Sequence, residues 1–354
     1  MSPSKIRVVN TIWPADSIEF CPHPSFQDIV VCGTYNLESS PVTTNEHTYD
    51  AQLASKSKQV RRGKCLVYQV STDKNTPLSP SCSAVLGIAD SEGNISLHEW
   101  KPPQRRLDLL QKISCAPDDV LCLSLDWSNR RYPTSSLGSL IVSLSDGSLS
   151  LLRPCSQGEL AISDKWHAHD HEPWIAAWDY WDTSVLYSGG DDLKMKGWDE
   201  RRGFGQPTFV NKRFEAGVTT IQSHPHIEHL IAVGSYDNKV RLFDTRKPLK
   251  SLMDVDVGGG AWRVKWHPLA ERKHDLLVAC MHDGFKIIRF GSGAASDEQS
   301  LFADGASYEI AKRFDEHESL AYGVDWSFKQ HTSGNETLIA SCSFYDCALN
   351  LWCG

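Results

Sequence analysis

The stretch IAVGSYDNKVRLFDTR (Ile231–Arg246) begins with an apolar run and passes through a polar segment at Tyr236, Asp237 and Asn238. It ends in a run in which apolar and charged side chains alternate. Alternation with a period of two is typical of a half-buried β-strand, and a short polar segment between two such runs indicates a tight turn. Taken alone, the stretch predicts a β-hairpin.

The same plan recurs along the chain. Its other copies are IVSLSDGSLSLLR (Ile141–Arg153), LYSGGDDLKMKGWDERR (Leu186–Arg202), VACMHDGFKIIRF (Val278–Phe290) and IASCSFYDCALNLW (Ile339–Trp352). The turn acids of the series are Glu92, which is a weaker member, Asp146, Asp192, Asp237, Asp283 and Asp346. From Asp146 to Asp283 they follow one another at 45 or 46 residues. Repeats of about this length, with four short strands each, are typical of β-propeller blades.

A second short element precedes most hairpins and ends in an aromatic or polar pair. Its copies are DSIEFCPHP, VLCLSLDWS, PWIAAWDYW, VTTIQSHPH, AWRVKWHPL and AYGVDWSFK. We expect these six to be inner strands that line a central channel.

Counting hairpins gives seven, including an interrupted one formed by DIVVCGTY and GKCLVYQV. The predicted fold is an all-β, seven-bladed β-propeller forming a single domain over residues 1–354. The second blade is expected to be incomplete and to lack its inner strand, because a full blade does not fit between Val70 and Ser83; the alternative is a very irregular strand in that segment. KIRVVNTIW, near the start, is expected to be the outermost strand of the last blade and to close the ring. The polar insert Asn36–Arg62 is predicted to be a disordered loop.

Composition restricts the function. The formal charge of −8 on 354 residues argues against direct binding to nucleic acid, which needs a basic surface. No apolar run is long enough to span a membrane, and no signal-peptide core is present. Eleven cysteines without CxxC spacing favour free thiols in a reducing compartment. These features predict a cytoplasmic protein that does not bind membranes.

Common catalytic motifs are absent from the sequence: there is no GxSxG, HExxH or GxxxxGK[ST]. His167, His169 and His171 alternate in WHAHDHEPW and could place three imidazoles on one side of an extended segment. No carboxylate or cysteine partner for a metal is fixed by sequence, however. The prediction is therefore no metal and no cofactor.

Aromatic residues gather at positions that share one face of a propeller. Loops before inner strands carry Trp174, Trp262 and Tyr322, and hairpin turns carry Tyr236, His282, Phe344 and Tyr345. The glycines Gly258, Gly259 and Gly260 permit close approach of the backbone beside Trp262. Each aromatic could instead pack between blades, but as a group they predict a pocket around one mouth of the channel.

The hairpins and their GWDE and LFDT endings resemble the WD-repeat family, in which the turn Asp caps backbone amides. In chain order, WIAAWDYW, YSGGDD, HPHIEHLIAVGSYD, GGGAWRVKWHP, ACMHDGFKI, SLAYGVDW and CSFYDCALNLW resemble the diphthine methylesterases, a WD-repeat family of diphthamide biosynthesis. This resemblance implies hydrolysis of the methyl ester of methylated diphthine on elongation factor 2, which gives diphthine and methanol. The implied partners are elongation factor 2 and other proteins of the pathway. The alternative is a non-catalytic WD-repeat scaffold for protein–protein interaction.

That substrate would assign roles to the aromatic mouth. Diphthine carries a trimethylammonium group, and aromatic faces attract such cations. The predicted substrate-binding residues are Trp174, Trp262, Tyr322, Tyr236, Tyr345 and Glu172. His282 is the predicted general base, and Asp283 either orients its ring or anchors the hairpin. Cys280, Cys342, Ser235 and Ser343 are possible nucleophiles, although water activated by His282 is favoured.

Overall fold

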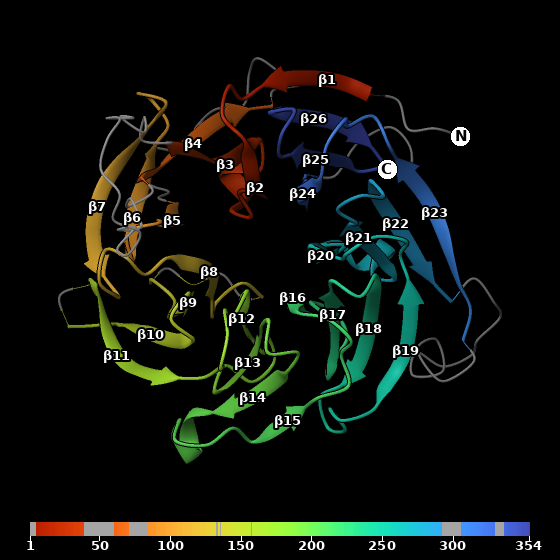
Figure 1. The fold of residues 1–354 in the computed structure, drawn as a ribbon. Helices are drawn as coiled ribbons and strands as arrows, with labels where there is room; N and C mark the ends of the chain where they lie inside the picture. Colours follow the sequence, from red (N-terminus) through yellow and green to blue (C-terminus); the bar gives the residue numbers. More distant parts are fainter. Residues whose placement is uncertain are drawn as a thin grey trace, which may run out of the picture.

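The computed structural model describes residues 5–38, 60–70, 84–131, 134, 136–156, 158–291, 306–329 and 336–354. The predicted all-β, seven-bladed β-propeller is confirmed. Seven antiparallel sheets surround a common axis, as Figure 1 shows. Five of these sheets have four strands and two have three in the described residues.

The six predicted inner strands are all present. They are β2 (Ala15–Phe20), β8 (Cys122–Trp127), β12 (Ile175–Trp178), β16 (Val218–Ser223), β20 (Arg263–Trp266) and β24 (Ala321–Trp326). Figure 1 shows them nearest the propeller axis. Five of the six end in Phe or Trp, and such large rings fill the space between neighbouring blades.

The recurrent hairpin supplies the two middle strands of each blade. The first strands of these hairpins are β3 (Ile29–Glu38), β5 (Val85–Ala89), β9 (Leu140–Leu144), β13 (Val185–Gly189), β17 (Leu230–Ser235), β21 (Asp275–Ala279) and β25 (Leu338–Ser343). The second strands are β4 (Val60–Gln69), β6 (Asn94–Lys101), β10 (Ser148–Pro154), β14 (Met195–Asp199), β18 (Lys239–Asp244), β22 (Phe285–Phe290) and β26 (Ala348–Cys353). In the stretch Ile231–Arg246, Ile231 pairs with Phe243 and Gly234 with Val240, as the predicted hairpin requires.

The turn acids hold the hairpins to the rest of their blades. The Asp237 carboxylate accepts hydrogen bonds from the backbone N–H of Lys239, at 3.2 Å, and of Glu215, at 3.1 Å. The first bond orders the turn, and the second ties the turn to the loop that leads into β16. This is the capping role that the repeat pattern predicts.

The second blade uses a different acid from the one predicted. The carboxylate of Asp90 accepts the N–H of Asn94 at 2.8 Å and the N–H of Glu92 at 2.9 Å. Glu92 lies at the repeat position, but Asp90 is the anchor. A carboxylate two residues earlier can reach both backbone donors of the turn.

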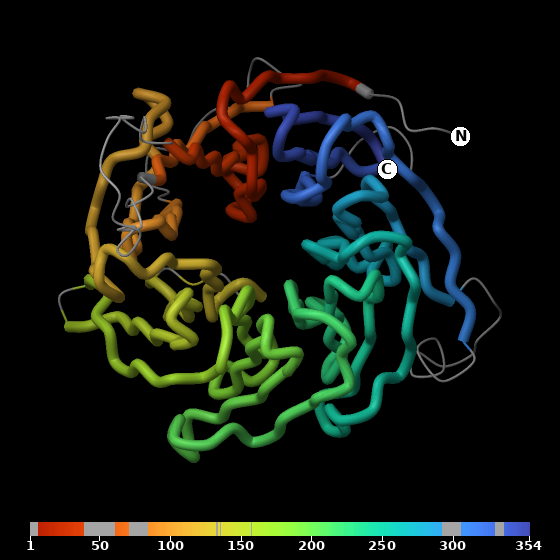
Figure 2. Tube along the Cα trace, in the orientation of Figure 1, coloured from red at the N-terminus to blue at the C-terminus, as the bar shows by residue number. Residues whose placement is uncertain are grey.

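The outer strands complete six of the blades. They are β7 (Arg106–Ser114), β11 (Leu160–His167), β15 (Phe209–Asn211), β19 (Ser251–Asp256), β23 (Tyr308–Phe314) and β1 (Lys5–Asn10). Strand β1 pairs with β26, with Val9 opposite Leu349 and Asn10 opposite Ala348. Figure 2 shows the beginning of the chain, in red, beside its blue end. The predicted closure of the ring by the N-terminal strand is therefore confirmed.

Two predictions concern the first two blades. The sheets β2–β3–β4 and β5–β6–β7 have three strands each, and residues 71–83 between them lie outside the described residues. The predicted absence of an inner strand between Val70 and Ser83 therefore stays a prediction. The boundaries of the predicted loop Asn36–Arg62 are wrong, because Asn36 pairs with Arg62 and Glu38 with Val60. Residues 39–59 of that loop lie outside the described residues.

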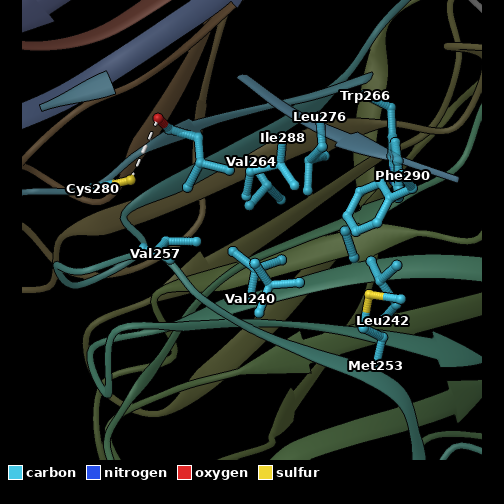
Figure 3. Packing of buried hydrophobic residues seen from close by; sticks show 14 of the residues in the cluster. Val240, Leu242, Met253, Val257, Val264, Trp266, Leu276, Cys280, Ile288 and Phe290 are labelled. Carbon is cyan, nitrogen blue, oxygen red and sulfur yellow. Dashed lines mark hydrogen bonds between the residues drawn. The ribbon is translucent and has the colours of Figure 1, made fainter. Parts of the chain in front are cut away.

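The apolar cores lie between neighbouring sheets. Figure 3 shows one of them, in which Val240 and Leu242 of β18 meet Leu276 of β21 and Phe290 of β22. These side chains are almost completely buried. Such burial contributes about 25 cal/mol per Å² of apolar surface, so stacking of the sheets is the main source of stability. Three short 3-10 turns, η1 (Pro24–Phe26), η2 (Glu200–Arg202) and η3 (Ala270–Arg272), lie in the connections.

Candidate functional site

The structure brings the predicted aromatic residues together at one mouth of the channel. The rings of Trp174 and Trp262 lie 5.7 Å apart, and Tyr236 lies 5.8 Å from Trp262. Tyr322 stacks on Trp262 at 4.9 Å with an interplanar angle of 25°. Four elements supply these rings: the loops before β12 and β20, the β17–β18 turn, and β24. They form one continuous cluster.

Further rings extend the cluster toward solvent. Phe344 lies 5.2 Å from Tyr322 and 4.9 Å from Tyr35, a residue of β3 that the sequence reasoning did not single out. Tyr345 packs edge-on against Phe344 but is 74% exposed. Tyr345 thus lies at the outer rim, beyond the half-buried rings of the cluster.

Asp191 is the carboxylate that contacts the aromatic cluster, and the predicted role of Glu172 stays a prediction. The indole N–H of Trp174 donates to the Asp191 carboxylate at 2.7 Å. Glu172 is exposed, and its backbone carbonyl accepts the N–H of Asp191 at 2.9 Å. A Cβ at Gly217 would lie 2.2 Å from the Asp191 carboxylate, so only glycine leaves room for this group.

Two more charged residues reach the cluster and were also missed. Asp16 of β2 and Arg263 of β20 both act electrostatically on Tyr236. A comparison of the repeats could have found the two carboxylates, Asp191 and Asp16. Asp191 stands directly before its turn acid, as Tyr236 does, and Asp16 stands four residues before the aromatic end of its strand, as Trp262 does.

Burial and nearby carboxylates act on the two phenols of the mouth. Burial, with the nearby Asp191 and Asp16 carboxylates, raises the pKa of Tyr236 well above its usual value. Burial raises the pKa of Tyr322 to about 12, with a contribution from Asp16. Burial also raises the pKa of Asp16 itself, although Arg263 opposes that change. The phenols therefore remain neutral at physiological pH.

The structure does not bring His282 into contact with the aromatic cluster. His282 is exposed, and no hydrogen bond or ring contact joins it to the cluster among the described residues. Met281 is the residue of this turn that lies inward: its carbonyl accepts the N–H of Ala321 at 2.8 Å, and a Cβ at Gly260 would lie 2.9 Å from its sulfur.

Asp283 anchors the hairpin and does not orient His282. Its carboxylate pairs with the Lys286 ammonium and with the Arg313 guanidinium, the latter at 2.7 Å. Burial alone would raise its pKa, but these two hydrogen bonds lower the pKa below its usual value. Both carboxylate oxygens are engaged in ion pairs, as expected if Asp283 anchors the hairpin.

We expect replacement of His282 by alanine to have little effect. An exposed side chain without partners contributes within about 0.5 kcal/mol to stability. The free energy of unfolding and the affinity for the cationic probes described below should both match those of the wild type. Denaturant titration and calorimetry check this, and a large loss of affinity would place His282 in the site.

The predicted nucleophiles are all buried. Cys280 lies within the core of Figure 3, and burial raises the pKa of its thiol to about 12. Burial also holds the pKa of Cys342 well above its usual range. Ser235 donates to the carbonyl of Ala216 at 3.0 Å, and Ser343 hydrogen-bonds with the Asp346 carboxylate. These side chains stabilise strands and turns.

The three alternating histidines do not converge. His169 is buried, with Nδ1 2.8 Å from the Asp192 carboxylate and Nε2 2.7 Å from the Ser188 hydroxyl, to which Trp198 also donates. His167 and His171 are exposed. No group of three or more potential metal ligands occurs in the described part of the chain. Burial lowers the pKa of His169, which favours its neutral, structural form.

A separate groove of about 500 Å³ lies away from the aromatic cluster. Trp166 and Phe204, stacked at 4.0 Å, line it together with the ion pair of Arg153 and Glu200. None of the predicted site residues lines this groove. The channel mouth remains the better candidate, because it combines converging rings with carboxylates and a guanidinium.

The fold and these contacts define a WD-repeat β-propeller. The Trp–Ser–His–Asp arrangement of the fourth blade recurs in the last one, where His317, Ser341, Asp346 and Trp352 interact. A propeller from the crystal structure of a mitotic checkpoint complex matches 99% of this chain and 94% of its own, with a TM-score of 0.67 and 14% identity. No protein-family model matches the chain.

Curated relatives identify the family. Diphthine methyltransferase from Mus musculus is 37% identical over 92% of this chain and 70% of its own length. The Dictyostelium discoideum homolog is 31% identical over 96% of each chain, and the Homo sapiens protein is 35% identical over 91% of this chain and 74% of its own. The chain belongs to the diphthine methyltransferase family.

These relatives overturn the predicted hydrolysis. They are named for methyl transfer, which is the opposite of removing a methyl group from an ester. The assignment to carboxylic ester hydrolases, made from resemblance and not from residues, is therefore wrong. The scaffold alternative gains no support from these names. No helix among the described residues is long and apolar enough to cross a membrane.

Proposed function

We propose that this propeller binds the diphthine side chain of a protein substrate and takes part in the methyl transfer for which its relatives are named. The observation that carries the proposal is the cluster of Trp174, Tyr236, Trp262 and Tyr322. The protein substrate in this proposal is elongation factor 2, and the reaction takes place in the cytoplasm. Other proteins of diphthamide synthesis are further proposed partners.

The physical support comes from the nature of the ligand. A trimethylammonium group is bulky and permanently charged, and it cannot donate a strong hydrogen bond. Aromatic rings attract such cations, with each good contact contributing about 0.5–2 kcal/mol. Three of the four rings are half-buried, which leaves ring surface open to a ligand.

The carboxylates favour the same ligand. Asp191 is held beside Trp174, and Asp16 acts on both Tyr236 and Tyr322. Their negative charge lies at a partly desolvated position, where Coulomb attraction is stronger than in bulk water. A cation that enters the mouth meets aromatic surface and negative charge together.

Binding of choline tests the site. The wild type should bind choline more tightly than its neutral tert-butyl isostere, because the two share a shape and differ in charge. The Tyr322→Leu variant should weaken choline binding by roughly 2- to 30-fold, the loss of one cation–π contact. Titration calorimetry measures all of these affinities.

The matched control is Tyr308→Leu, which removes an exposed ring from the outer strand β23. Its affinity for choline should equal that of the wild type. Equal binding of choline and of the neutral isostere by the wild type would contradict recognition of the cation.

The reaction needs its own test. Elongation factor 2 that carries diphthine would be incubated with the protein and a sulfonium methyl donor, and its intact mass followed. The expected result is a gain equal to one methyl group in place of a hydrogen. The ammonium nitrogen is already quaternary, so a carboxyl oxygen accepts the methyl group as the donor's sulfur–carbon bond breaks and the donor leaves as a thioether. An unchanged mass, or a loss, would contradict the proposed direction of transfer.

A further inference from the structure

A guanidinium group lies within the aromatic mouth. Arg263 follows Trp262 directly, and its guanidinium carbon lies 5.2 Å from the centre of that ring. Its Nη1 donates to the carbonyls of Trp262, at 3.1 Å, and of Thr219, at 3.4 Å. No carboxylate lies within ion-pair distance of it among the described residues, and Nε and Nη2 have no hydrogen-bond partner there. The cationic group thus keeps donors available.

A second donor at the same place lacks a partner. The indole N–H of Trp262 is buried and makes no hydrogen bond in the described part of the chain. Trp262 itself is only 7% exposed. An unpaired buried donor is costly and uncommon in native proteins, so its persistence at a functional site suggests a ligand acceptor.

The Arg263 guanidinium and the Trp262 N–H are not the groups expected in a site for a simple cation. A guanidinium beside the ring would repel a trimethylammonium group, and it would also compete for the aromatic face. A carboxyl group on the ligand removes the conflict, because guanidinium and indole N–H groups both donate to carboxyl oxygens.

We propose that the channel mouth recognises a betaine, a ligand whose quaternary ammonium lies next to a carboxyl group. The rings and Asp191 hold the ammonium, whereas Arg263 and the Trp262 N–H hold the carboxyl oxygens. This inference rests on the proposed function and names Arg263 as a residue that determines specificity. The short distance from Arg263 to the Trp262 ring requires the two ligand groups to be close neighbours, as they are in diphthine.

The test compares two probes of the same cation. Tetramethylammonium carries the ammonium alone, and glycine betaine adds one carboxylate. Titration calorimetry of the wild type should show tighter binding of betaine. Arg263→Gln should weaken betaine binding by roughly tenfold or more, the loss of a charge-assisted hydrogen bond. Binding of tetramethylammonium should be unchanged or stronger, because a like charge has been removed.

Two further variants sharpen the result. Trp262→Phe keeps an aromatic ring but removes the N–H, so it should weaken betaine binding more than tetramethylammonium binding. Arg246→Gln removes an exposed arginine that follows β18 and pairs with Asp244, the last residue of that strand, and it should change neither affinity. Circular dichroism confirms that each variant is folded before titration.

The outcomes separate this inference from the proposal on which it rests. If tetramethylammonium does not bind at all, the cation site itself is wrong. If it binds, but betaine binds no better and Arg263→Gln leaves both affinities unchanged, the cation site stands and the carboxyl subsite is refuted. In that case Arg263 would serve only to cover the Trp262 ring.

Discussion

Removal of residues 1–12 should lower the free energy of unfolding by at least about 3 kcal/mol. Strand β1 is the outer strand of the last blade, and its loss would break the backbone ladder to β26. Thr11, which is buried, would also be lost with its two bonds to the Cys347 carbonyl, from the backbone N–H at 2.8 Å and from the hydroxyl at 2.9 Å. Urea denaturation of both chains measures the difference.

The control keeps the strand and changes only its outer face. Ile6 and Val8 are 56% and 46% exposed, so Ile6→Thr and Val8→Thr should each alter stability by no more than about 0.5 kcal/mol. The truncated protein should also self-associate, because β26 would become an unprotected edge. An unfolding midpoint equal to that of the wild type would show that β1 does not close the ring.

The fold was predictable because its information is local and repeated. The hairpin around Asp237 contains an apolar run, a turn acid and an alternating strand, and each copy reinforces the others. The predicted bounds of the loop were wrong because polar residues at its two ends pair in a β-ladder. Asn36 and Arg62 lie opposite each other in a ladder, but their side chains are those of a solvent-exposed loop. Amino-acid composition does not show which backbone groups are hydrogen-bonded to each other.

The candidate site was predictable only in part. Trp174, Trp262 and Tyr236 were found because propeller topology places their repeat positions on one face. His282 occupies the same turn position as Tyr236 but is exposed, whereas the neighbouring Met281 contacts Gly260 and Ala321. Side-chain direction in a turn depends on backbone angles that the hairpin pattern does not specify. Asp191 was overlooked because two adjacent aspartates resemble a single turn anchor.

The inner strands also carry an ionic network that no sequence motif predicted. Arg130 joins Asp126, at 2.8 Å, to Glu19, at 3.4 Å. Lys265 joins Glu19 to Asp325, whose oxygen lies 3.7 Å from the ammonium nitrogen. The network links inner strands β8, β2, β20 and β24. It therefore connects four blades across the channel.

Replacing Lys265 with methionine should cost about 2–4 kcal/mol of stability at pH 8. Removing one partner of a buried ion pair usually costs about 3–5 kcal/mol, because the remaining charge loses its compensation. The lower figure applies here because the Glu19 side chain is 38% exposed and water can screen it. Methionine preserves most of the side-chain volume, so the measured loss reports mainly on charge. Urea denaturation measures the loss, and a change below about 1 kcal/mol at pH 8 would show that the network contributes little.

The pKa values of Asp325 and Glu19 determine how the stability loss caused by Lys265→Met changes with pH. In the wild type, burial raises the pKa of Asp325 to about 7, although Lys265 opposes the change. A carboxyl whose pKa is raised on folding loses stability as pH rises from its unfolded value, near 4, through its folded value. Without Lys265 the pKa of Asp325 must rise further. The pKa of Glu19, which Lys265 and Arg130 lower to about 2 against the effect of burial, must rise as well.

The loss caused by Lys265→Met should therefore be larger at pH 8 than at pH 5, where protonation removes part of the uncompensated charge. Adding Glu19→Gln to Lys265→Met should recover much of the loss at pH 8, because the added change removes the carboxylate that lost its partner. If both pH values give the same loss and the double variant is no more stable, Lys265 contributes by packing alone, and charge balance does not hold the four blades together.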